Sequence, residues 1–261
     1  MSTFSEHAKI IPAGFDDGWI LELDGDVQSH VDLVDPSVIR FEYLHRIANV
    51  IDVCWPATQP IKVLHLGAGA LTLPRYIQAT RPGSHQTVVE LDPRLIPLVV
   101  DELPLPEGTH LDVVTGDARA QVQAMETHYF DAVVVDIFTG GDTAAHLTGE
   151  NFYRELIDRL APQGVLLVNI GEDEDGLQFF TAQARALHTV AREFQGAWTL
   201  ADASTLVHRS SGNAVIAAGG GLPIDDDAQE VLRSRLAAAG PHPATVLTPS
   251  DTVSLLENLN G

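Results

Sequence analysis

Cysteine is almost absent from this sequence, and long apolar runs are absent altogether. The one cysteine, Cys54, excludes an intramolecular disulfide, which fits a reducing compartment and predicts a cytoplasmic protein. No apolar run approaches the roughly 18 residues that a membrane-spanning helix requires, so we expect no membrane partner. The first residues, MSTFSEHAKIIPAG, lack the basic segment and apolar core of a secretion signal.

Basic residues are also scarce. Lys and Arg number 15 against 36 Asp and Glu, so the formal net charge is −21. That charge repels nucleic acid phosphates and anionic lipids and suits a cationic small molecule, although solubility alone is an alternative explanation. The 11 histidines show no His-x-x-x-His spacing and no Cys-x-x-Cys pair exists, so we expect no metal site.

Strand and helix patterns alternate from residue 61 onward. The expected strands are 61–66, 86–91, 111–117, 130–138 and 164–170, and the expected helices are 71–79, 93–102, 152–160 and 177–194. This alternation predicts an α/β fold on a parallel sheet with right-handed crossovers. Residues 205–220 then predict a closing antiparallel hairpin about Ser211-Gly212-Asn213.

A glycine turn, Gly67-Ala68-Gly69, follows the first of these strands. In open α/β sheets the ligand lies beyond the carboxyl ends of the strands, where glycines let the backbone approach it. Glu90 follows Gly69 by 21 residues, about where an acid that binds ribose hydroxyls is expected. Thr72 stands where dinucleotide-binding turns carry a third small residue, which disfavours a dinucleotide. A tight strand-to-helix connection is the purely structural alternative.

Two further acids, Asp117 and Asp136, follow the third strand and end the fourth. The Asp117 carboxylate can accept a hydrogen bond from an exocyclic amine such as that of adenine, and the backbone N–H of Ala118 can donate to the ring. Together with the glycine turn and Glu90, these residues predict recognition of adenosine without a phosphate cradle.

Over residues 18–220 the chain resembles the spermidine synthase (aminopropyltransferase) family. The stretches that carry the resemblance are LDGDVQS, VLHLGAGA, VVELDP, VTGDAR, FDAVVVDIF, TGENFYRELIDRLAPQGVLLVN and SGNAVIAA. The resemblance implies an α/β fold with a Rossmann-like, seven-stranded methyltransferase sheet, parallel with a C-terminal antiparallel hairpin. A small β-hairpin region precedes that sheet.

The family transfers an aminopropyl group from decarboxylated S-adenosylmethionine to a diamine such as putrescine, leaving methylthioadenosine. By resemblance, Gln28 touches the nucleoside, Glu90 holds the ribose, and Asp117 with Ala118 holds the adenine. Asp136 sits beside the attacking amine, where a carboxylate can orient it and take its proton. The resemblance implies no metal.

The sequence departs from the family pattern at several places. The glycine turn of the family carries an Asp that anchors the donor amine, where this chain has Ala70 or at best Leu71. A second family Asp, three residues after the strand-four Asp, is Thr139 here. Asp142 and the acids of GEDEDG (171–176) are candidate substitutes for binding the amine, or else a solvated loop and helix start.

The family also carries a Tyr-His pair near the start of the first helix. This pair is not clearly present here, because RFEYLHR (40–46) presents its residues in another order. These departures leave two alternatives open. An S-adenosylmethionine-dependent methyltransferase would lack the Asp at position 70, because that acid would repel the donor carboxylate. A non-catalytic nucleoside-binding protein could have lost both amine anchors.

The sequence predicts three segments. Residues 1–55 hold a β-hairpin within 18–33, turning at Asp24-Gly25, and a linking helix within 36–55. Residues 56–221 form the S-adenosyl-nucleoside-binding domain. Residues 222–261 form a peripheral extension with one helix near 226–239 and a proline-rich tail. A homodimer through the N-terminal hairpin is expected, because so small a sheet buries little by itself.

Overall fold

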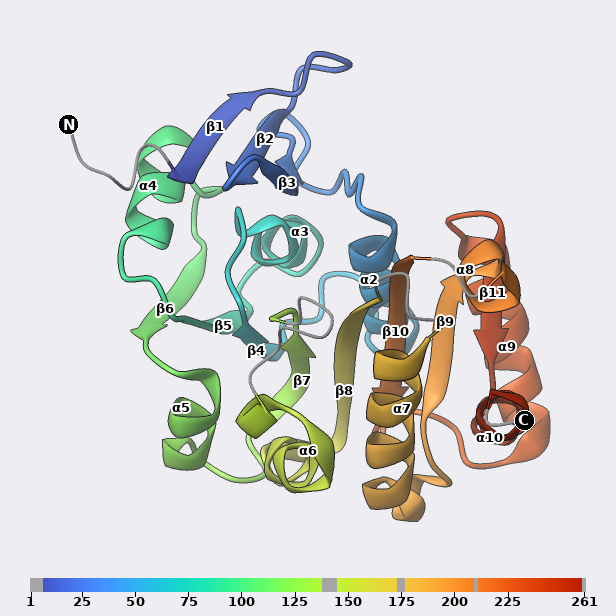
Figure 1. The fold of residues 1–261 in the computed structure, drawn as a ribbon. Helices are drawn as coiled ribbons and strands as arrows, with labels where there is room; N and C mark the ends of the chain where they lie inside the picture. The colour runs from blue at the N-terminus through green and yellow to red at the C-terminus, as the bar shows by residue number, and fades with distance from the viewer. Residues whose placement is uncertain (1–6, 138–144, 173–176, 209–210, 260–261) are drawn as a thin grey trace.

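A computed structural model describes residues 7–137, 145–172, 177–208 and 211–259 of the chain (Figure 1). The side chains of Glu172 and His208 lie outside that description. The structure has two sheets, a three-stranded one near the N-terminus and an eight-stranded one that carries most of the helices. No helix in the described ranges is long and apolar enough to cross a bilayer.

The N-terminal sheet has the strand order β1 (Ala8–Pro12), β2 (Trp19–Leu23) and β3 (Asp26–Val31), all antiparallel. Asp24 and Gly25 both have positive φ, 53° and 93°, as a two-residue hairpin turn between β2 and β3 requires. The predicted hairpin is therefore confirmed, and β1 is an unpredicted third strand. Leu21, Val31 and Ala70 share a buried cluster, which fixes this sheet on the glycine turn of the larger domain.

Helix α2 (Glu42–Cys54) links the two sheets. The helix was predicted within residues 36–55, and because residues 36–41 are not helical, it occupies only the later part of that range. Leu44, Ile47 and Ile51 recur at helical spacing and pack into the cluster on one face of the large sheet. This late start places Tyr43 in the first turn of α2.

The large sheet has the order β11-β9-β10-β8-β7-β4-β5-β6. Its parallel strands are β4 (Lys62–Leu66), β5 (His85–Glu90), β6 (His110–Thr115), β7 (Phe130–Val135) and β8 (Leu160–Glu172). The helices between and after them are α3 (Thr72–Thr80), α4 (Leu95–Glu102), α5 (Ala118–Ala124), α6 (Gly149–Ile157) and α7 (Gln178–Val190), with short 3-10 turns η2 (Ala145–Leu147) and η3 (Arg192–Phe194). The α/β prediction is confirmed, and α5 is an unpredicted helix.

The closing antiparallel strands differ from the predicted hairpin. Its expected first half forms helix α8 (Ala203–His208), and β9 (Trp198–Asp202) pairs with β10 (Gly212–Ala218) instead. The tertiary environment decides this, because Leu206 and Thr205 are buried on α8. β10 inserts between β8 and β9, antiparallel to both.

The C-terminal segment contributes an eighth strand to the sheet, where we predicted seven. Helix α9 (Asp226–Ala239) matches the predicted helix and is capped by Asp225, whose carboxylate accepts from the Ala228 N–H. The expected proline-rich tail instead contains β11 (Ala244–Leu247), which pairs with β9, and α10 (Pro249–Asn258). Leu256 of α10 packs into the main core, so this tail is built into the large domain.

Buried clusters cover both faces of the large sheet. One cluster contains Leu64, Leu66, Val133 and Val135, whereas the other contains Val63 and Val134. A strand buried on both faces is almost continuously apolar, as β7 is. Because β4, β5 and β7 are parallel neighbours, their carboxyl ends lie at one edge of the sheet, beneath the N-terminal sheet (Figure 1).

Candidate active site

The turn after β4 requires glycine at two positions. Gly67 has φ +96°, and a Cβ there would collide with the Asp136 carbonyl. Gly69 has φ +48°, and a Cβ there would lie 2.6 Å from Ser29 Oγ. Ser29 Oγ also accepts from the Ala70 N–H at 3.1 Å. The turn is thus packed between β7 and the N-terminal sheet, and its backbone lines a pocket.

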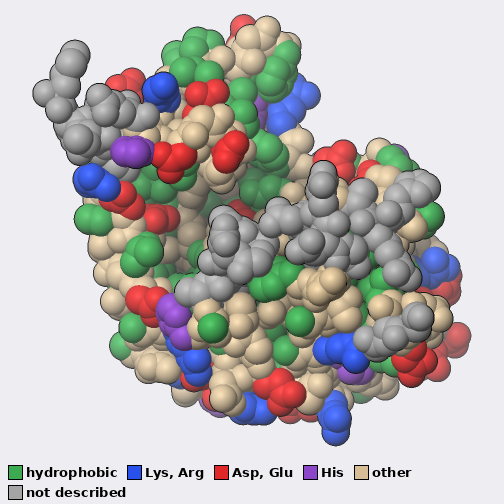
Figure 2. Space-filling model, viewed as in Figure 1, with side chains coloured by type: hydrophobic (Ala, Val, Ile, Leu, Met, Phe, Trp, Pro, Cys, Tyr) green, Lys and Arg blue, Asp and Glu red, His purple; other side chains and the backbone are tan. Residues whose placement is uncertain are grey.

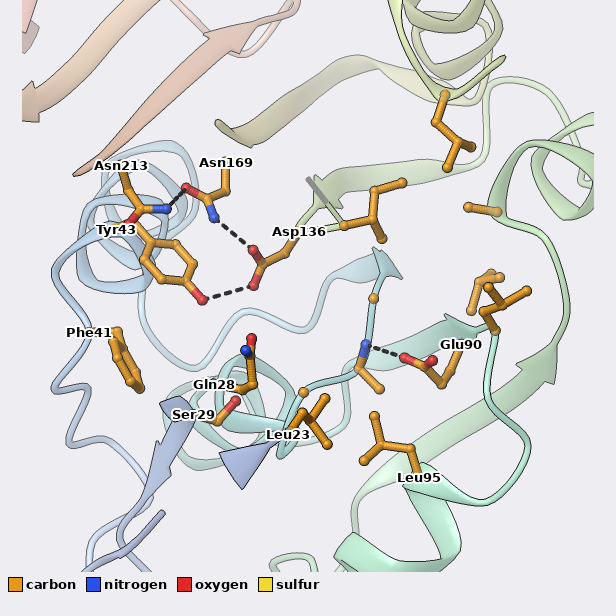
Figure 3. A pocket seen from close by; sticks show the side chains of 18 of the residues that line it. Leu23, Gln28, Ser29, Phe41, Tyr43, Glu90, Leu95, Asp136, Asn169 and Asn213 are labelled. Carbon is orange, nitrogen blue, oxygen red and sulfur yellow. Dashed lines mark hydrogen bonds between the residues drawn. The ribbon is translucent and has the colours of Figure 1, made fainter. Parts of the chain in front are cut away.

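Glu90, at the end of β5, points across this turn. Its Oε2 accepts from the Ala68 N–H at 3.1 Å (Figure 3). Its Oε1 accepts from the Asp92 N–H at 2.9 Å. Both oxygens keep further acceptor capacity, because a carboxylate has about four lone-pair sites. The backbone therefore fixes Glu90 beside the glycine turn with lone pairs available to a ligand.

Asp117, after β6, is the N-cap of α5. Its Oδ1 accepts from the Ala120 N–H at 3.0 Å, and its Oδ2 lies 2.6 Å from His146 Nε2. The contact with His146 is the largest cause that holds the pKa of Asp117 below its usual value. The two side chains are 39% and 48% exposed, so this pair adds little to folding stability. An adenine amine at Asp117 would have to share Oδ2 with His146.

Asp136, which follows β7, is the centre of a hydrogen-bonded chain. The Tyr43 hydroxyl donates to its Oδ2 at 3.1 Å, and Asn169 Nδ2 donates to its Oδ1 at 2.8 Å. Asn213 Nδ2 donates in turn to Asn169 Oδ1 at 3.1 Å (Figure 3). Burial raises the pKa of Asp136, and the two donors partly oppose that rise. Burial and the neighbouring Asp136 charge also raise the pKa of Tyr43, so its hydroxyl remains a donor.

These groups share one pocket of about 510 Å³, large enough for a nucleoside with a short side chain. Figure 2 shows the surface hollowed below the N-terminal sheet, and Figure 3 shows the interior. The structure brings together seven residues that the sequence indicated: Gln28, Gly67, Gly69, Glu90, Asp117, Ala118 and Asp136. The candidate Asp142 and the departure at Thr139 lie outside the described residues, as do the acids at 173–175 of GEDEDG and the side chain of Glu172.

Four polar residues of the pocket were missed by the sequence reasoning. Ser29, Tyr43, Asn169 and Asn213 all line it. Tyr43 was visible in RFEYLHR, but the order of that segment did not match the expected pair. Asn169 carried one usable signal, because it is a polar residue near the end of an otherwise apolar strand, on the edge where ligands bind.

The described lining of the pocket is acidic. Glu90, Asp117 and Asp136 contribute carboxylates, and none of the described lining residues is Lys or Arg. Ala70 is fully buried in the cluster that joins the N-terminal sheet to the turn. A charged side chain at position 70 would therefore need a different local packing.

Comparisons with known proteins agree with this architecture. The chain is 27% identical over 151 residues to a polyamine aminopropyltransferase of Neisseria meningitidis, which covers 57% of this chain and 56% of that protein. It thus spans little more than half the length of that curated relative. The crystal structure of a probable spermidine synthase from Corynebacterium glutamicum superposes with a TM-score of 0.81 at 26% identity, covering 97% of this chain and 90% of the other.

A more distant likeness shows the fold alone. Human methyltransferase-like protein 13 in complex with SAH matches with a TM-score of 0.54 at 16% identity, covering 75% of this chain and 91% of that one. The sheet is therefore of the methyltransferase type. Residues 41–201, which are 161 of the 261 residues, match the family described as the spermine/spermidine synthase domain. The chain belongs to the spermine/spermidine synthase family.

Proposed function

We propose that the protein is an aminopropyltransferase. It moves the aminopropyl group of decarboxylated S-adenosylmethionine to a diamine such as putrescine and releases methylthioadenosine. The observation that carries the proposal is Asp136, a carboxylate held by Tyr43 and Asn169 inside a pocket of nucleoside size. Membership of the spermine/spermidine synthase family supports the same reaction.

The nucleoside would lie along the glycine turn, with its ribose hydroxyls on Glu90. Asp117 and the Ala118 N–H would take the adenine, and Gln28 would cover the nucleoside from the N-terminal sheet. The contacts of Glu90 with Ala68 and Asp92 support this placement, because they hold the carboxylate rigidly before a ligand arrives. No metal takes part in the proposed reaction.

The chemistry needs one proton removed and two groups aligned. The acceptor ammonium loses a proton to Asp136, and the amine lone pair then attacks the carbon beside the sulfonium. The carbon–nitrogen bond forms as the carbon–sulfur bond breaks, and the sulfur leaves as the neutral thioether of methylthioadenosine. Because the sulfonium is already an activated leaving group, alignment of the two reactants supplies most of the remaining acceleration.

The charge of the pocket supports the decarboxylated donor. Intact S-adenosylmethionine would bring a carboxylate to a described lining that contains acids and no Lys or Arg. Such a carboxylate would be repelled, whereas a diamine and an aminopropyl group are both cationic. Asp142 is our candidate for binding the acceptor amine, in place of the family acid absent at Thr139.

Release of methylthioadenosine tests the proposal directly. We expect the purified protein to release it from decarboxylated S-adenosylmethionine with putrescine or another diamine, in equal amount to the elongated amine. Asp136→Asn is the negative control. Failure to release it with any diamine or polyamine, while the nucleoside still binds, would exclude this function.

Methyl transfer is the second candidate, and the buried Ala70 favours it. Without an acid at position 70, the turn lacks the group that would bind a donor amine and repel a methionine carboxylate. Calorimetric titration with both donors separates the two functions. Binding of intact S-adenosylmethionine at least tenfold tighter than its decarboxylated form would favour the methyltransferase, and the reverse order would favour aminopropyl transfer. A protein that binds either donor without turnover would be a nucleoside-binding protein.

We further propose a cytoplasmic homodimer that associates through the N-terminal sheet. The small size of that sheet and the single cysteine, Cys54, support this. Residues 1–55, 56–221 and 222–261 are the proposed segments. Light scattering on the full chain tests the association, and a monomer at micromolar concentration would contradict it.

A further inference from the structure

A second, much smaller cavity lies beneath the glycine turn. Its volume is about 30 Å³, and His65, Ser29 and Asp136 are among the residues that line it. His65 on β4 pairs with Val134 on β7, and side chains alternate along a strand. Asp136 comes two residues after Val134, so its side chain leaves the sheet on the same face as His65. The cavity therefore connects a buried imidazole with the proposed base.

The partner of His65 fixes which ring nitrogen carries the proton. Gln86 donates its Nε2 to the Pro74 carbonyl at 3.0 Å, so its Oε1 is the atom that lies 3.0 Å from His65 Nε2. His65 Nε2 must then carry the hydrogen, and Nδ1 keeps a lone pair. Burial lowers the pKa of His65 to about 4, so the ring is neutral near pH 7. Among the described residues the one hydrogen bond of the His65 ring is that of Nε2 with Gln86, and the ring lines the cavity.

Ser29 supplies the complementary group. Its Oγ accepts from the Ala70 N–H, which leaves the hydroxyl proton to be donated elsewhere. The nearby Thr72 hydroxyl is already used, because it donates to the His30 carbonyl at 2.8 Å. A water molecule needs about 10–15 Å³ and two to four polar partners, and this cavity meets both conditions.

We infer that His65 and Ser29 hold one water molecule against Asp136, and that His65 is a positioning residue for the proposed base. The water accepts from the Ser29 hydroxyl and donates one hydrogen to His65 Nδ1 and the other to the Asp136 carboxylate. His65 never touches the substrate. It acts by aiming the second hydrogen of the water at Asp136, and this role rests on the proposed function.

The water would be the third donor to Asp136, after Tyr43 and Asn169. Donors to a carboxylate favour its charged form, and the charged form is the one that can accept the substrate proton. The other titratable side chains in the described lining of the two cavities are Glu90 and Asp117. Neither of them is a cation that could offset the burial of Asp136, which raises its pKa, so the donors are the groups that favour the ionised carboxylate.

The pH profile tests this inference in the full-length protein. His65→Leu replaces the ring with an apolar side chain of similar size, and we expect the acid limb of kcat/KM to move up by about half to one pH unit. His65→Asn keeps a polar group near the position of Nδ1 and should recover part of that shift. Leu64→Val, on the opposite face of β4, is the matched control and should leave the limb in place.

A measurement without substrate separates this inference from the proposed function. We would follow the Asp136 carboxyl by ¹³C NMR as the pH changes, with Asp136→Asn to assign the signal. A higher midpoint in His65→Leu supports the inference even if no aminopropyl transfer occurs, and an unchanged midpoint overturns it. Should His65→Leu fail to fold, Ser29→Ala removes the other partner of the water and carries the same expectations.

Discussion

The Tyr43 hydroxyl donates to Asp136 Oδ2 at 3.1 Å, although the two residues lie 93 positions apart in the sequence. Tyr43 comes from the first turn of α2 and Asp136 from the end of β7, so the contact joins the linking helix to the ligand-binding edge of the sheet. Asn169 of β8 holds the other carboxylate oxygen. A hydrogen bond to each carboxylate oxygen thus fixes the orientation of Asp136 before any substrate binds.

Replacing the proposed base is the first prediction. Asp136→Asn keeps the size of the side chain but removes its ability to accept a proton from the acceptor ammonium. We expect kcat to fall by about 10²–10⁴-fold, the usual range for a general base. Release of methylthioadenosine at saturating donor measures it. A variant that keeps more than half of the wild-type kcat would assign the base elsewhere.

Stability serves as the control for that variant. Burial raises the pKa of Asp136 in the folded protein, so the folded state binds more protons than the unfolded state above pH 3.8. Stability therefore falls as the pH rises from 3.8 through the folded pKa, and Asn does not carry this penalty. Asp136→Asn should unfold at the same or a higher temperature than wild type at neutral pH. Lost activity together with a higher Tm would exclude unfolding as the cause.

The second prediction concerns Tyr43. Tyr43→Phe removes one donor from a charged acceptor, which should lower kcat/KM by about tenfold to a hundredfold. With one donor fewer, the pKa of Asp136 rises further, so activity should fall off at a higher pH on the acid side. Tyr76→Phe is the matched control, because the Tyr76 hydroxyl donates to Asp52, outside the pocket. A shift of equal size in both variants would contradict a specific role for Tyr43.

Ribose recognition gives the third prediction. Glu90→Gln leaves one acceptor oxygen where the wild type has two, and it puts an N–H₂ group toward the backbone N–H of Ala68 or Asp92. We expect methylthioadenosine to bind about tenfold to a hundredfold more weakly, as measured by calorimetry. The exposed Glu102→Gln is the control for charge alone. Equal affinities for Glu90→Gln and wild type would place the ribose elsewhere.

The order of strands and their terminal residues made much of the pocket predictable. Gly67, Glu90 and Asp136 each end or follow a strand, and the carboxyl ends of neighbouring parallel strands meet at one edge. Local pattern and topology were therefore enough to bring them together. Tyr43 was different, because its place depends on where α2 begins, and residues 36–41 fit a helical pattern without forming a helix.

The C-terminal strands could not be predicted from local sequence pattern either. Residues 205–208 suit a strand or a helix by pattern, and the burial of Leu206 against the core selects the helix. β11 has four residues, too few to show a period, and its pairing with β9 comes from the completed sheet. His65 is buried on β4, and its relation to Asp136 depends on the register of β4 on β7, which the sequence pattern does not show.

The fourth prediction is an acid sensitivity of folding that originates in His65. The pKa of this ring is 6.5 in an unfolded chain and about 4 in the folded protein, because burial disfavours the charged form. Between those values the unfolded state binds a proton that the folded state does not. Protonation of His65 therefore does not lower the free energy of unfolding above pH 6.5. As the pH falls from 6.5 toward 4, the free energy of unfolding decreases by about 3 kcal/mol in total.

Urea unfolding of wild type and His65→Leu at a series of pH values measures this contribution. Other groups titrate in the same window, so the informative quantity is the difference between the two proteins. The unfolding free energy of His65→Leu should depend less on pH between 6.5 and 4, whereas the exposed His85→Leu should retain the wild-type slope. Parallel curves for wild type and His65→Leu would mean that folding does not lower the pKa of the ring from 6.5. The ring would then be protonated below that pH in the folded protein as well, and there Nδ1 could not accept a hydrogen from the water beside Asp136.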